Sequence, residues 1–197
     1  MINSYSYSME AGIDEAGRGA LCGRVYAAAV ILPPTYNDDT YELIKDSKKI
    51  SKKNRKILKE YIENVALAYA VEYSEVEEID DINILQATIN AMHKALDKLT
   101  IQPQHIIVDG TYFHKYKNIE HKVIKKGDSI YRNIAAASIL AKVYHDEYIL
   151  NLLKSFPNLE TYGLQSNMGY GTKKHILAIK KNGPTPFHRK SFKTFNL

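Results

Sequence analysis

The chain has 197 residues, and its 27 Lys and Arg against 22 Asp and Glu give a formal net charge of +5, a weak hint of a polyanionic partner. Its length is that of one ordinary domain, and its single cysteine, Cys22, excludes an intramolecular disulfide framework and a four-cysteine zinc site. Hydrophobic residues make up 45% of the chain and charged residues 25%, which excludes a disordered tail and indicates a folded globular protein.

A short strand at 9–13 and a buried strand at 25–32 open the predicted fold, because each is an apolar run near turn residues. Ser51 is placed to cap a helix that continues to Val65, and a partly alternating stretch at 66–76 predicts a third strand. The run at 25–32 is far shorter than the ~20 residues that a membrane-spanning helix needs. The N-terminus has no basic segment followed by an apolar one, so we expect no signal peptide and a cytoplasmic protein.

The second half of the chain is predicted to be richer in helix. Apolar residues at steps of three or four predict a helix at 82–99, with Asp80 or Asp81 as its cap. The order of elements predicts an α/β fold with a mixed central sheet flanked by helices and a helical C-terminal part. The remaining predicted elements are strands at 106–108 and 122–124, an alanine-rich helix at 134–153, and a helix capped by Thr172 that ends at Asn182 before Gly183-Pro184.

Charge is distributed unevenly along the chain. The segment 161–197 has no acidic residue, whereas 1–160 has a net charge of −2 and includes a basic run at 45–59. We interpret 1–160 as the core and 161–197 as a basic helical extension packed on the same domain. A charged run is usually a solvated face, but two basic segments can form one phosphate-binding surface if the fold brings them together. The seven basic residues of 161–197 are Lys173, Lys174, Lys180, Lys181, Arg189, Lys190 and Lys193.

Four acidic residues adjoin predicted strands or helices. Asp14 and Glu15 follow the first strand, Asp109 closes the strand at 106–108, and Asp128 precedes the alanine-rich helix. Taken singly, each of them is better explained as a helix cap or a turn residue. Acidic residues that converge above one sheet edge would repel one another unless cations neutralised them. Carboxylates without thiolates favour Mg²⁺ or Mn²⁺, and two such ions can clamp the attacking and leaving oxygens of a phosphoryl transfer.

Two glycines flank Arg18 directly after the first acidic pair. Gly17, Gly19 and Gly23 are spaced one residue too widely for a dinucleotide-binding fingerprint, and the adjacent acidic pair would repel a pyrophosphate. We therefore disfavour a nucleotide-dependent oxidoreductase. The segment is better explained as backbone that approaches a sugar–phosphate closely, with Arg18 able to hold a phosphate.

The segment Gly12-Ile13-Asp14-Glu15-Ala16-Gly17-Arg18-Gly19 resembles the signature of the type 2 ribonucleases H, the ribonuclease HII family. Further matches follow in the family's order, and the resemblance covers the chain from about residue 9 to 193. These matches are Asp46-Ser47-Lys48-Lys49, Ile82-Asn83-Ile84-Leu85-Gln86-Ala87-Thr88, Val108-Asp109-Gly110, Gly127-Asp128, the run from Ile134 to Val143, Gly169-Tyr170-Gly171-Thr172, and the run from Gly183 to Arg189.

The resemblance implies a ribonuclease H-like fold, with 1–160 as its catalytic core, and an endonuclease that uses Mg²⁺ or Mn²⁺. Such enzymes hydrolyse the RNA strand of RNA–DNA hybrids. They also cut duplex DNA on the 5′ side of a single embedded ribonucleotide, leaving 3′-hydroxyl and 5′-phosphate ends. The implied partners are therefore nucleic acids, and we expect a monomer that requires no protein partner.

By motif match, the metal-binding catalytic carboxylates correspond to Asp14, Glu15, Asp109 and Asp128. The backbone of Gly17-Arg18-Gly19 corresponds to the loop that senses the ribose 2′-OH, the group that distinguishes RNA from DNA at one position. Tyr170 corresponds to the tyrosine that stacks on the sugar beside the junction. Further candidates for phosphate contacts or for support of the site are Lys48, Asn83, Ser138 and Lys142.

Some features depart from the family's usual pattern. Ala20 and Arg24 stand where prolines are common, and 158–168 is a few residues longer than usual, which bears on loop rigidity and substrate preference. The related ribonuclease HIII class usually lacks the arginine of the glycine loop and has an extra N-terminal domain. This chain has Arg18 and about nine residues before its first predicted strand, so type 2 fits better. A duplex-binding module without catalysis is the alternative from another class, and the complete set of four acidic residues argues against it.

Overall fold

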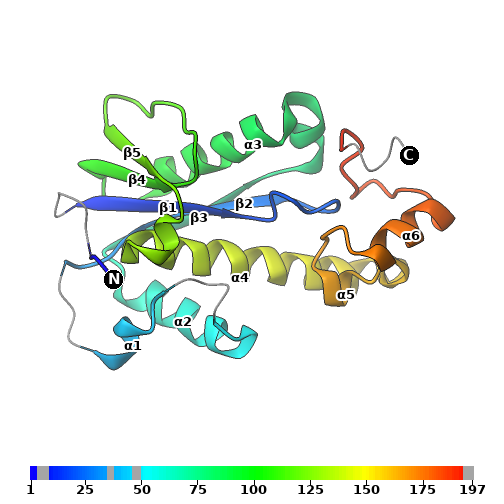
Figure 1. Cartoon of the computed structure of the whole chain (residues 1–197), viewed down its shortest axis with the longest axis horizontal. Coiled ribbons are helices and arrows are strands. Elements are labelled where there is room, and N and C mark those ends of the chain that lie inside the picture. Colours follow the sequence, from blue (N-terminus) through cyan, green and yellow to red (C-terminus); the bar gives the residue numbers. More distant parts are fainter. Residues whose placement is uncertain (4–8, 35–37, 46–49, 193–197) are drawn as a thin grey trace.

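Five strands form one mixed sheet in the order β3-β2-β1-β4-β5 (Figure 1). The structure is a computed structural model that describes residues 1–3, 9–34, 38–45 and 50–192. β1 is antiparallel to β2, which is antiparallel to β3, whereas β1, β4 and β5 run parallel. The predicted α/β fold with a mixed sheet is confirmed. The strands are β1 (Glu10–Ala16), β2 (Val25–Ile31), β3 (Ala68–Ser74), β4 (His105–Asp109) and β5 (Glu120–Ile124).

Helices cover both faces of this sheet (Figure 1). α4 packs across β1 and β2 with α2 beside it, and α3 packs on the opposite face of β2 and β3. β2 is apolar throughout because Ala28 and Val30 pack toward α4 while Ala29 and Ile31 pack toward α3. The helices are α1 (Asp39–Glu42), α2 (Lys52–Val65), α3 (Val76–Lys98), α4 (Arg132–Ser155), α5 (Leu164–Asn167) and α6 (Lys173–Asn182), with 3₁₀ turns η2 (Gly127–Ser129) and η3 (Pro157–Tyr162).

The first strand is longer than predicted. β1 continues to Ala16, because its last residues still pair with β2 beyond its last pair with β4, at Ile13. Asp14 lies opposite Ala28 in this register, so it belongs to the strand and does not follow it. The acidic side chain is therefore held by regular strand geometry beside the end of β4.

The predicted helix at 82–99 is the second part of the longer α3. Asn83 interrupts α3 with a φ of +69°, and its side-chain oxygen accepts hydrogen bonds from the N–H groups of Leu85 and Gln86. Asparagine tolerates this left-handed backbone and is a favourable cap, so Asn83 caps the second part. The prediction of Asp80 or Asp81 as the cap was therefore wrong.

The C-terminal helices pack on the end of α4. Leu152 and Leu153 of α4 share an apolar cluster with Leu159, Leu164 and Ile179. Thr172 caps α6 by accepting a hydrogen bond from the N–H of His175, and Gly183 follows the helix with a φ of +76°, so both predicted limits of α6 are confirmed. The division at residue 160 stays an interpretation, and it falls within η3. Within the described ranges, no helix has the length and apolar character needed to cross a bilayer.

Candidate active site

Three of the predicted acidic residues meet at one edge of the sheet. Asp14 lies on β1, Asp109 ends the parallel neighbour β4, and Asp128 lies in η2. The register pairs Ile13 with Val108, which places the next residues of both strands side by side. One carboxylate oxygen from each of the three residues lies within 4.8 Å of the others. A single divalent cation can contact oxygens at this spacing after small side-chain adjustments.

Glu15 lines the same pocket without belonging to this group of three. Successive side chains of a strand point to opposite faces, so Glu15 approaches the site from a different side than Asp14. Its carboxylate lies 3.6 Å from the guanidinium of Arg18. The open pocket has a volume of about 360 Å³ and is lined by Asp14, Glu15, Ala16, Arg55, Asp109, Ser138, Lys142 and Tyr170.

The cations near this pocket do not fully neutralise its carboxylates. Burial raises the pKa of Asp14 well above its usual value, and repulsion from Glu15 and Asp109 raises it further, while a hydrogen bond with Ser138 partly opposes this. Burial also raises the pKa of Glu15, against the opposing effect of Arg18. A hard divalent cation would relieve this repulsion, and every donor in the set is an oxygen, as Mg²⁺ and Mn²⁺ prefer.

The backbone around η2 orients one of these carboxylates. The N–H of Gly127 donates a hydrogen bond of 2.8 Å to Oδ1 of Asp109. A Cβ at Gly127 would lie 2.6 Å from Cδ1 of Ile134, so a glycine allows η2 to pack this closely on α4. The contact fixes the orientation of the Asp109 carboxylate beside Asp14 and Asp128.

The glycine loop and Tyr170 form one assembly. The N–H of Gly17 donates a hydrogen bond of 3.2 Å to the Tyr170 hydroxyl, although the two residues are 153 positions apart. Gly17 has a φ of +84°, and a Cβ there would lie 2.4 Å from Cδ2 of His145. Ala20 and Tyr170 also form a β-bridge. The structure thus places the predicted loop and the predicted tyrosine together beside the carboxylates.

Two of the other predicted site residues line the pocket. Ser138 lines the pocket and bonds Asp14, and Lys142 lines it with its ammonium 2.8 Å from Asp146 and 5.3 Å from the centre of the Tyr170 ring. Asn83 caps α3 and does not line this pocket, so a substrate contact there stays a prediction. Lys48, with its motif Asp46-Ser47-Lys48-Lys49, lies outside the described residues.

Arg55 lines the pocket, but it was not predicted from the sequence as a site residue. It appeared only within the basic run at 45–59, and α2 brings its side chain to the carboxylate pocket from the same face of the sheet as α4. No local motif marks Arg55, because its place depends on how α2 packs against α4. It adds a second cation, besides Lys142, to the wall of the pocket.

Arg24 shows why a residue other than proline fits after the glycine loop. Its guanidinium donates two hydrogen bonds to Glu75, of 2.6 and 2.9 Å, and lies over the rings of Tyr73 and Tyr148. A bidentate ion pair between two aromatic rings restrains the side chain, so it fixes the end of the loop by contacts where a proline would restrict the backbone.

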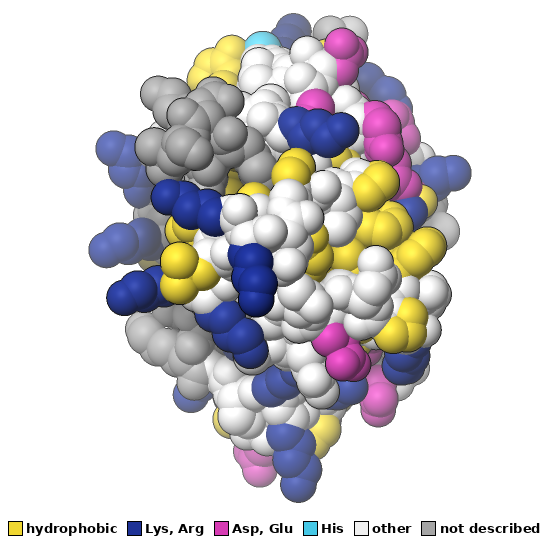
Figure 2. Space-filling model, turned by 90° about the vertical axis from the view of Figure 1, so that its right-hand side faces the viewer, with side chains coloured by type: hydrophobic (Ala, Val, Ile, Leu, Met, Phe, Trp, Pro, Cys, Tyr) yellow, Lys and Arg dark blue, Asp and Glu magenta, His cyan; other side chains and the backbone are white. Residues whose placement is uncertain are grey.

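Only some basic side chains of the C-terminal segment are exposed on the surface. Figure 2 shows Lys and Arg side chains spread over the end of the molecule that carries α6, with acidic side chains fewer and mainly along one side. Arg189 is fully buried, so it cannot contribute to the phosphate-binding surface that the basic segment could form. Lys193 lies outside the described residues. The exposed lysines of α6 are Lys173, Lys174, Lys180 and Lys181.

We expect the free energy of unfolding to fall as the pH drops from about 6.5 toward 4. Unfolded histidines titrate near pH 6.5, so in this range the unfolded chain binds more protons than the folded chain. Each additional proton lowers the free energy of unfolding by about 1.4 kcal/mol per pH unit. The raised pKa values of Asp14 and Glu15 act in the opposite direction, because acid relieves their repulsion. Burial lowers the pKa of His93, His121, His145, His175 and His188, and that of His188 to about 4.

Urea unfolding at several pH values measures this dependence. His188→Gln removes the histidine whose pKa is lowered to about 4, so its curve should be shallower than that of the native protein. Equal slopes for the two proteins, or a stability that does not change between pH 6.5 and about 4.5, would contradict the prediction.

Comparisons with known proteins agree on one family. A family model described as Ribonuclease HII matches residues 11–195. The chain is 52% identical over 184 residues to a protein named Ribonuclease HII from Bacteroides thetaiotaomicron, covering 93% of this chain and 89% of that protein. It is 50% identical over 194 residues to one of the same name from Christiangramia forsetii, covering 98% and 95%.

Solved structures show the same fold. The ribonuclease H2 from Pyrococcus horikoshii OT3 matches with a TM-score of 0.76 and 25% identity, over 95% of each chain. A chain of the PCNA:RNase HII complex from Archaeoglobus fulgidus matches with a TM-score of 0.77 and 25% identity, over 94% of this chain and 95% of that one.

Proposed function

The chain belongs to the ribonuclease HII family and is thus an endonuclease that hydrolyses RNA in RNA–DNA hybrids, and we propose that it also cuts duplex DNA 5′ of a single embedded ribonucleotide. The proposal includes 3′-hydroxyl and 5′-phosphate ends as the products. The observation that carries it is the joint placement of the glycine loop and Tyr170 beside the carboxylates. A site that reads one ribose needs no run of ribonucleotides.

We assign the metal-binding and catalytic roles to Asp14, Glu15, Asp109 and Asp128. The family depends on divalent metal ions, and bound Mg²⁺ or Mn²⁺ would activate water and offset the charge that develops on the phosphate. In the protein, Ser138 holds Asp14 and the N–H of Gly127 holds Asp109, so both carboxylates are oriented before a substrate binds. Lys142 and Arg55 lie where they can contact the phosphates next to the cleaved bond.

Discrimination between ribose and deoxyribose would come from the loop at 17–19. The N–H of Gly17 and the carbonyls of Gly17 and Arg18 are already hydrogen-bonded within the protein, so a ribose 2′-OH would bond to the N–H groups of Arg18 and Gly19 or to the carbonyl of Gly19. A deoxyribose would leave those groups without a partner in a desolvated contact, which costs about 1–3 kcal/mol for each group. The ring of Tyr170 would stack on the neighbouring sugar, held by the hydrogen bond between its hydroxyl and Gly17.

Mapping the cut on a duplex with one ribonucleotide tests this proposal. We expect one cut on the 5′ side of the ribonucleotide, a 5′-phosphate on the fragment that retains it, and no cut in an all-DNA duplex of the same sequence. An RNA–DNA hybrid serves as the positive control for family activity. Cleavage of the hybrid alone, or a cut on the 3′ side of the ribonucleotide, would overturn the proposal.

We also propose that the protein acts as a cytoplasmic monomer and needs no protein partner for cleavage. The RNase HII of Archaeoglobus fulgidus has been solved in a complex with PCNA, so a partner that increases activity is compatible with this proposal. Gel filtration of the purified chain, followed by the cleavage assay on the same fractions, tests the monomeric state and the independence from a protein partner. Activity confined to a dimer fraction would contradict the monomer.

The exposed lysines of α6 are expected to bind the duplex backbone. Replacing Lys173, Lys174, Lys180 and Lys181 by Gln should weaken duplex binding and reduce the slope of log K against log salt by about 1 for each lost phosphate contact. The slope is measured by fluorescence anisotropy between low and moderate salt with a labelled duplex that carries no ribonucleotide.

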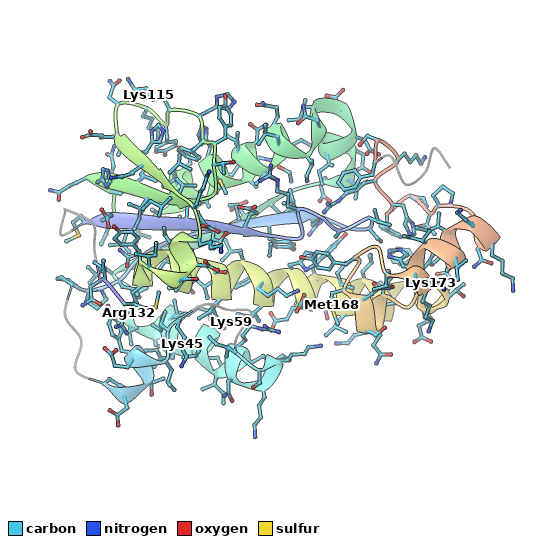
Figure 3. The ribbon with its side chains drawn as sticks, viewed as in Figure 1. Lys45, Lys59, Lys115, Arg132, Met168 and Lys173 are labelled. Carbon is cyan, nitrogen blue, oxygen red and sulfur yellow. The ribbon has the colours of Figure 1, made fainter. Side chains whose placement is uncertain are left out.

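A matched control removes exposed lysines elsewhere. Lys98, Lys115 and Lys117 are exposed, and Figure 3 shows Lys115 near the opposite end of the molecule from Lys173. Their replacement by Gln removes three positive charges, against four in the α6 variant, and should alter the salt slope much less for each charge removed. If the α6 variant keeps the native slope, α6 is a solvated face and not a binding surface.

A further inference from the structure

Arg189 is a fully buried cation whose hydrogen bonds go to backbone carbonyls, and its guanidinium also lies 5.3 Å from the centre of the Phe192 ring. Its Nε lies 2.8 Å from the carbonyl oxygen of Gly23, and its two terminal nitrogens lie 3.1 Å from that of Arg18 and 2.9 Å from that of Arg24. Among the described residues, no carboxylate forms an ion pair with it. Burial of a guanidinium costs free energy, and the three hydrogen bonds offset part of this cost. They also hold the carbonyls at the two ends of one loop.

The neighbouring His188 connects to Tyr170 through a second histidine. Nε2 of His188 lies 3.1 Å from Nε2 of His175, and Nδ1 of His175 lies 2.9 Å from the carbonyl oxygen of Tyr170. A carbonyl only accepts, so His175 donates from Nδ1 and accepts at Nε2 from the N–H of His188. The N–H of Thr185 donates to Nδ1 of His188, which agrees with this tautomer. The chain of bonds therefore fixes the backbone at Tyr170.

Backbone hydrogen bonds place the same C-terminal segment against the loop. The N–H of Leu21 donates to Gly169, the N–H of Gly23 donates to Phe187, and the N–H of Arg189 donates to Leu21. The loop's outgoing residues 20–23 thus lie between the segment that holds Tyr170 and the segment that holds Arg189. Residues 20–23 are thus joined by backbone hydrogen bonds to two stretches of the C-terminal part of the chain.

We propose that His188 and Arg189 are positioning residues for ribonucleotide recognition, Arg189 for the glycine loop and His188 for Tyr170. This inference rests on the proposed function, because it assigns the two residues to the part of the site that reads the ribose. Neither residue contacts the carboxylates, so both act through the loop and the tyrosine. A shift of about 1 Å in the glycine loop or in Tyr170 can lower the rate 10²-fold, so residues that hold these groups in place affect catalysis.

The test for Arg189 compares binding of two duplexes in a cleavage-deficient Asp14→Asn background with Mg²⁺ present. The duplexes are identical except that one contains a single ribonucleotide. We expect Arg189→Lys, which keeps the charge but not the three-way contact, to lower the affinity ratio of the two duplexes at least fivefold while the affinity for all-DNA duplex stays within twofold. Arg189→Met should act in the same direction.

Lys190→Gln is the charge-matched contrast for Arg189→Met, because each variant removes one positive charge and Lys190 is exposed beside Arg189. It should weaken the binding of both duplexes equally and leave their ratio unchanged. If Arg189→Lys also weakens both duplexes equally, Arg189 supports binding in general and the proposal is overturned. A native ratio in Arg189→Lys with a native melting temperature overturns it as well.

The test for His188 uses two substitutions that keep different halves of the imidazole. Gln can place an N–H donor near the position of Nε2, whereas Asn can replace the Nδ1 acceptor but cannot reach His175. We expect His188→Gln to retain most of the preference for the ribonucleotide-containing duplex and His188→Asn to lose it. The opposite order, or equal preference in both variants, would contradict the assigned role.

Hydrogen exchange separates a failure of this inference from a failure of the proposed function. Exchange at the amides of Gly17, Leu21 and Gly23 reports the order of the loop without any substrate. If the native protein shows no preference for the ribonucleotide-containing duplex, the proposed function fails. In that case unchanged protection of these amides in Arg189→Lys would overturn the positioning role too, and faster exchange confined to them would support it.

Discussion

Replacing Asp14 or Asp109 by Asn is expected to abolish cleavage of both substrates while raising the melting temperature of the metal-free protein. The loss of a carboxylate that binds the catalytic ions removes several kcal/mol of transition-state stabilisation, or roughly 10³-fold or more in rate. The gain in stability has a separate origin in the folded protein. It comes from removing one charge from a group of buried and half-buried carboxylates that repel one another.

The pKa directions determine the sign of this stability change. The pKa of Asp14 is raised, so the ionised carboxylate is less favourable in the folded chain than in the unfolded chain. Its destabilising effect is present above its folded pKa and is relieved as the pH falls through that value. An amide at position 14 is neutral and nearly the same size, so it removes the repulsion at neutral pH and can keep the hydrogen bond with Ser138.

Thermal unfolding in EDTA and in excess Mg²⁺ measures both effects. In EDTA the Asn variants should melt above the native protein, and in Mg²⁺ this difference should shrink or reverse, because only the native site gains full stabilisation by binding the ion. Asp97→Asn is the control. Its carboxylate is exposed and pairs with Lys117, which lowers its pKa, so the variant should lose a little stability in both buffers and keep its activity.

Two results would contradict this interpretation. Full cleavage by either Asn variant would remove the residue from the catalytic set. A lower melting temperature of both variants in EDTA would mean that the carboxylates stabilise the fold without metal, contrary to the repulsion inferred from their burial.

The strands and the carboxylates were accessible from sequence because they depend on local patterns. Asp109 was placed correctly at the end of an apolar run, and the parallel pairing of β1 with β4 then brings it to Asp14. The pairing itself is a long-range property, so the sequence could not show that the acidic residues converge. The kink at Asn83 was missed for a similar reason, since the apolar period of α3 continues on both sides of it.

Arg189 shows a different limit of sequence reasoning. A basic residue in an acid-free segment is usually exposed, and composition favoured a phosphate contact. The structure buries it because three carbonyls of the glycine loop converge on one guanidinium, and those carbonyls come from a segment about 170 positions earlier in the chain. The composition of a segment gives its number of charged residues, but it does not indicate which of them are buried in the fold.

Gly17→Ala is expected to lower the cleavage rate at a single ribonucleotide by about 10²-fold with only a moderate loss of stability. A Cβ at this position would lie 2.4 Å from Cδ2 and 2.6 Å from Nε2 of His145, and 3.0 Å from the carbonyl oxygen of Arg24. The loop must therefore shift away from His145. The shift would weaken the hydrogen bond between the N–H of Gly17 and Tyr170, which sets the spacing of the two recognition groups.

Gly183→Ala separates the steric effect from backbone strain. Gly183 also has a positive φ, of +76°, but a Cβ there would meet nothing within 4 Å. The strain alone should cost about 1–3 kcal/mol of stability and leave cleavage unchanged. If Gly183→Ala and Gly17→Ala lose cleavage equally, the loss reflects a general effect of strain and not the position of the loop.

A second substitution at His145 tests the cause directly. In the Gly17→Ala background, His145→Ala removes the ring that the new methyl group would meet, so the double variant should recover part of the lost rate. The single His145→Ala variant measures the cost of the cavity, and a double-mutant cycle then isolates the contact between the two positions. Recovery in the double variant would show that the loop is displaced by the ring. Additive losses would instead place the fault at the contact with Arg24, which the double variant leaves in place.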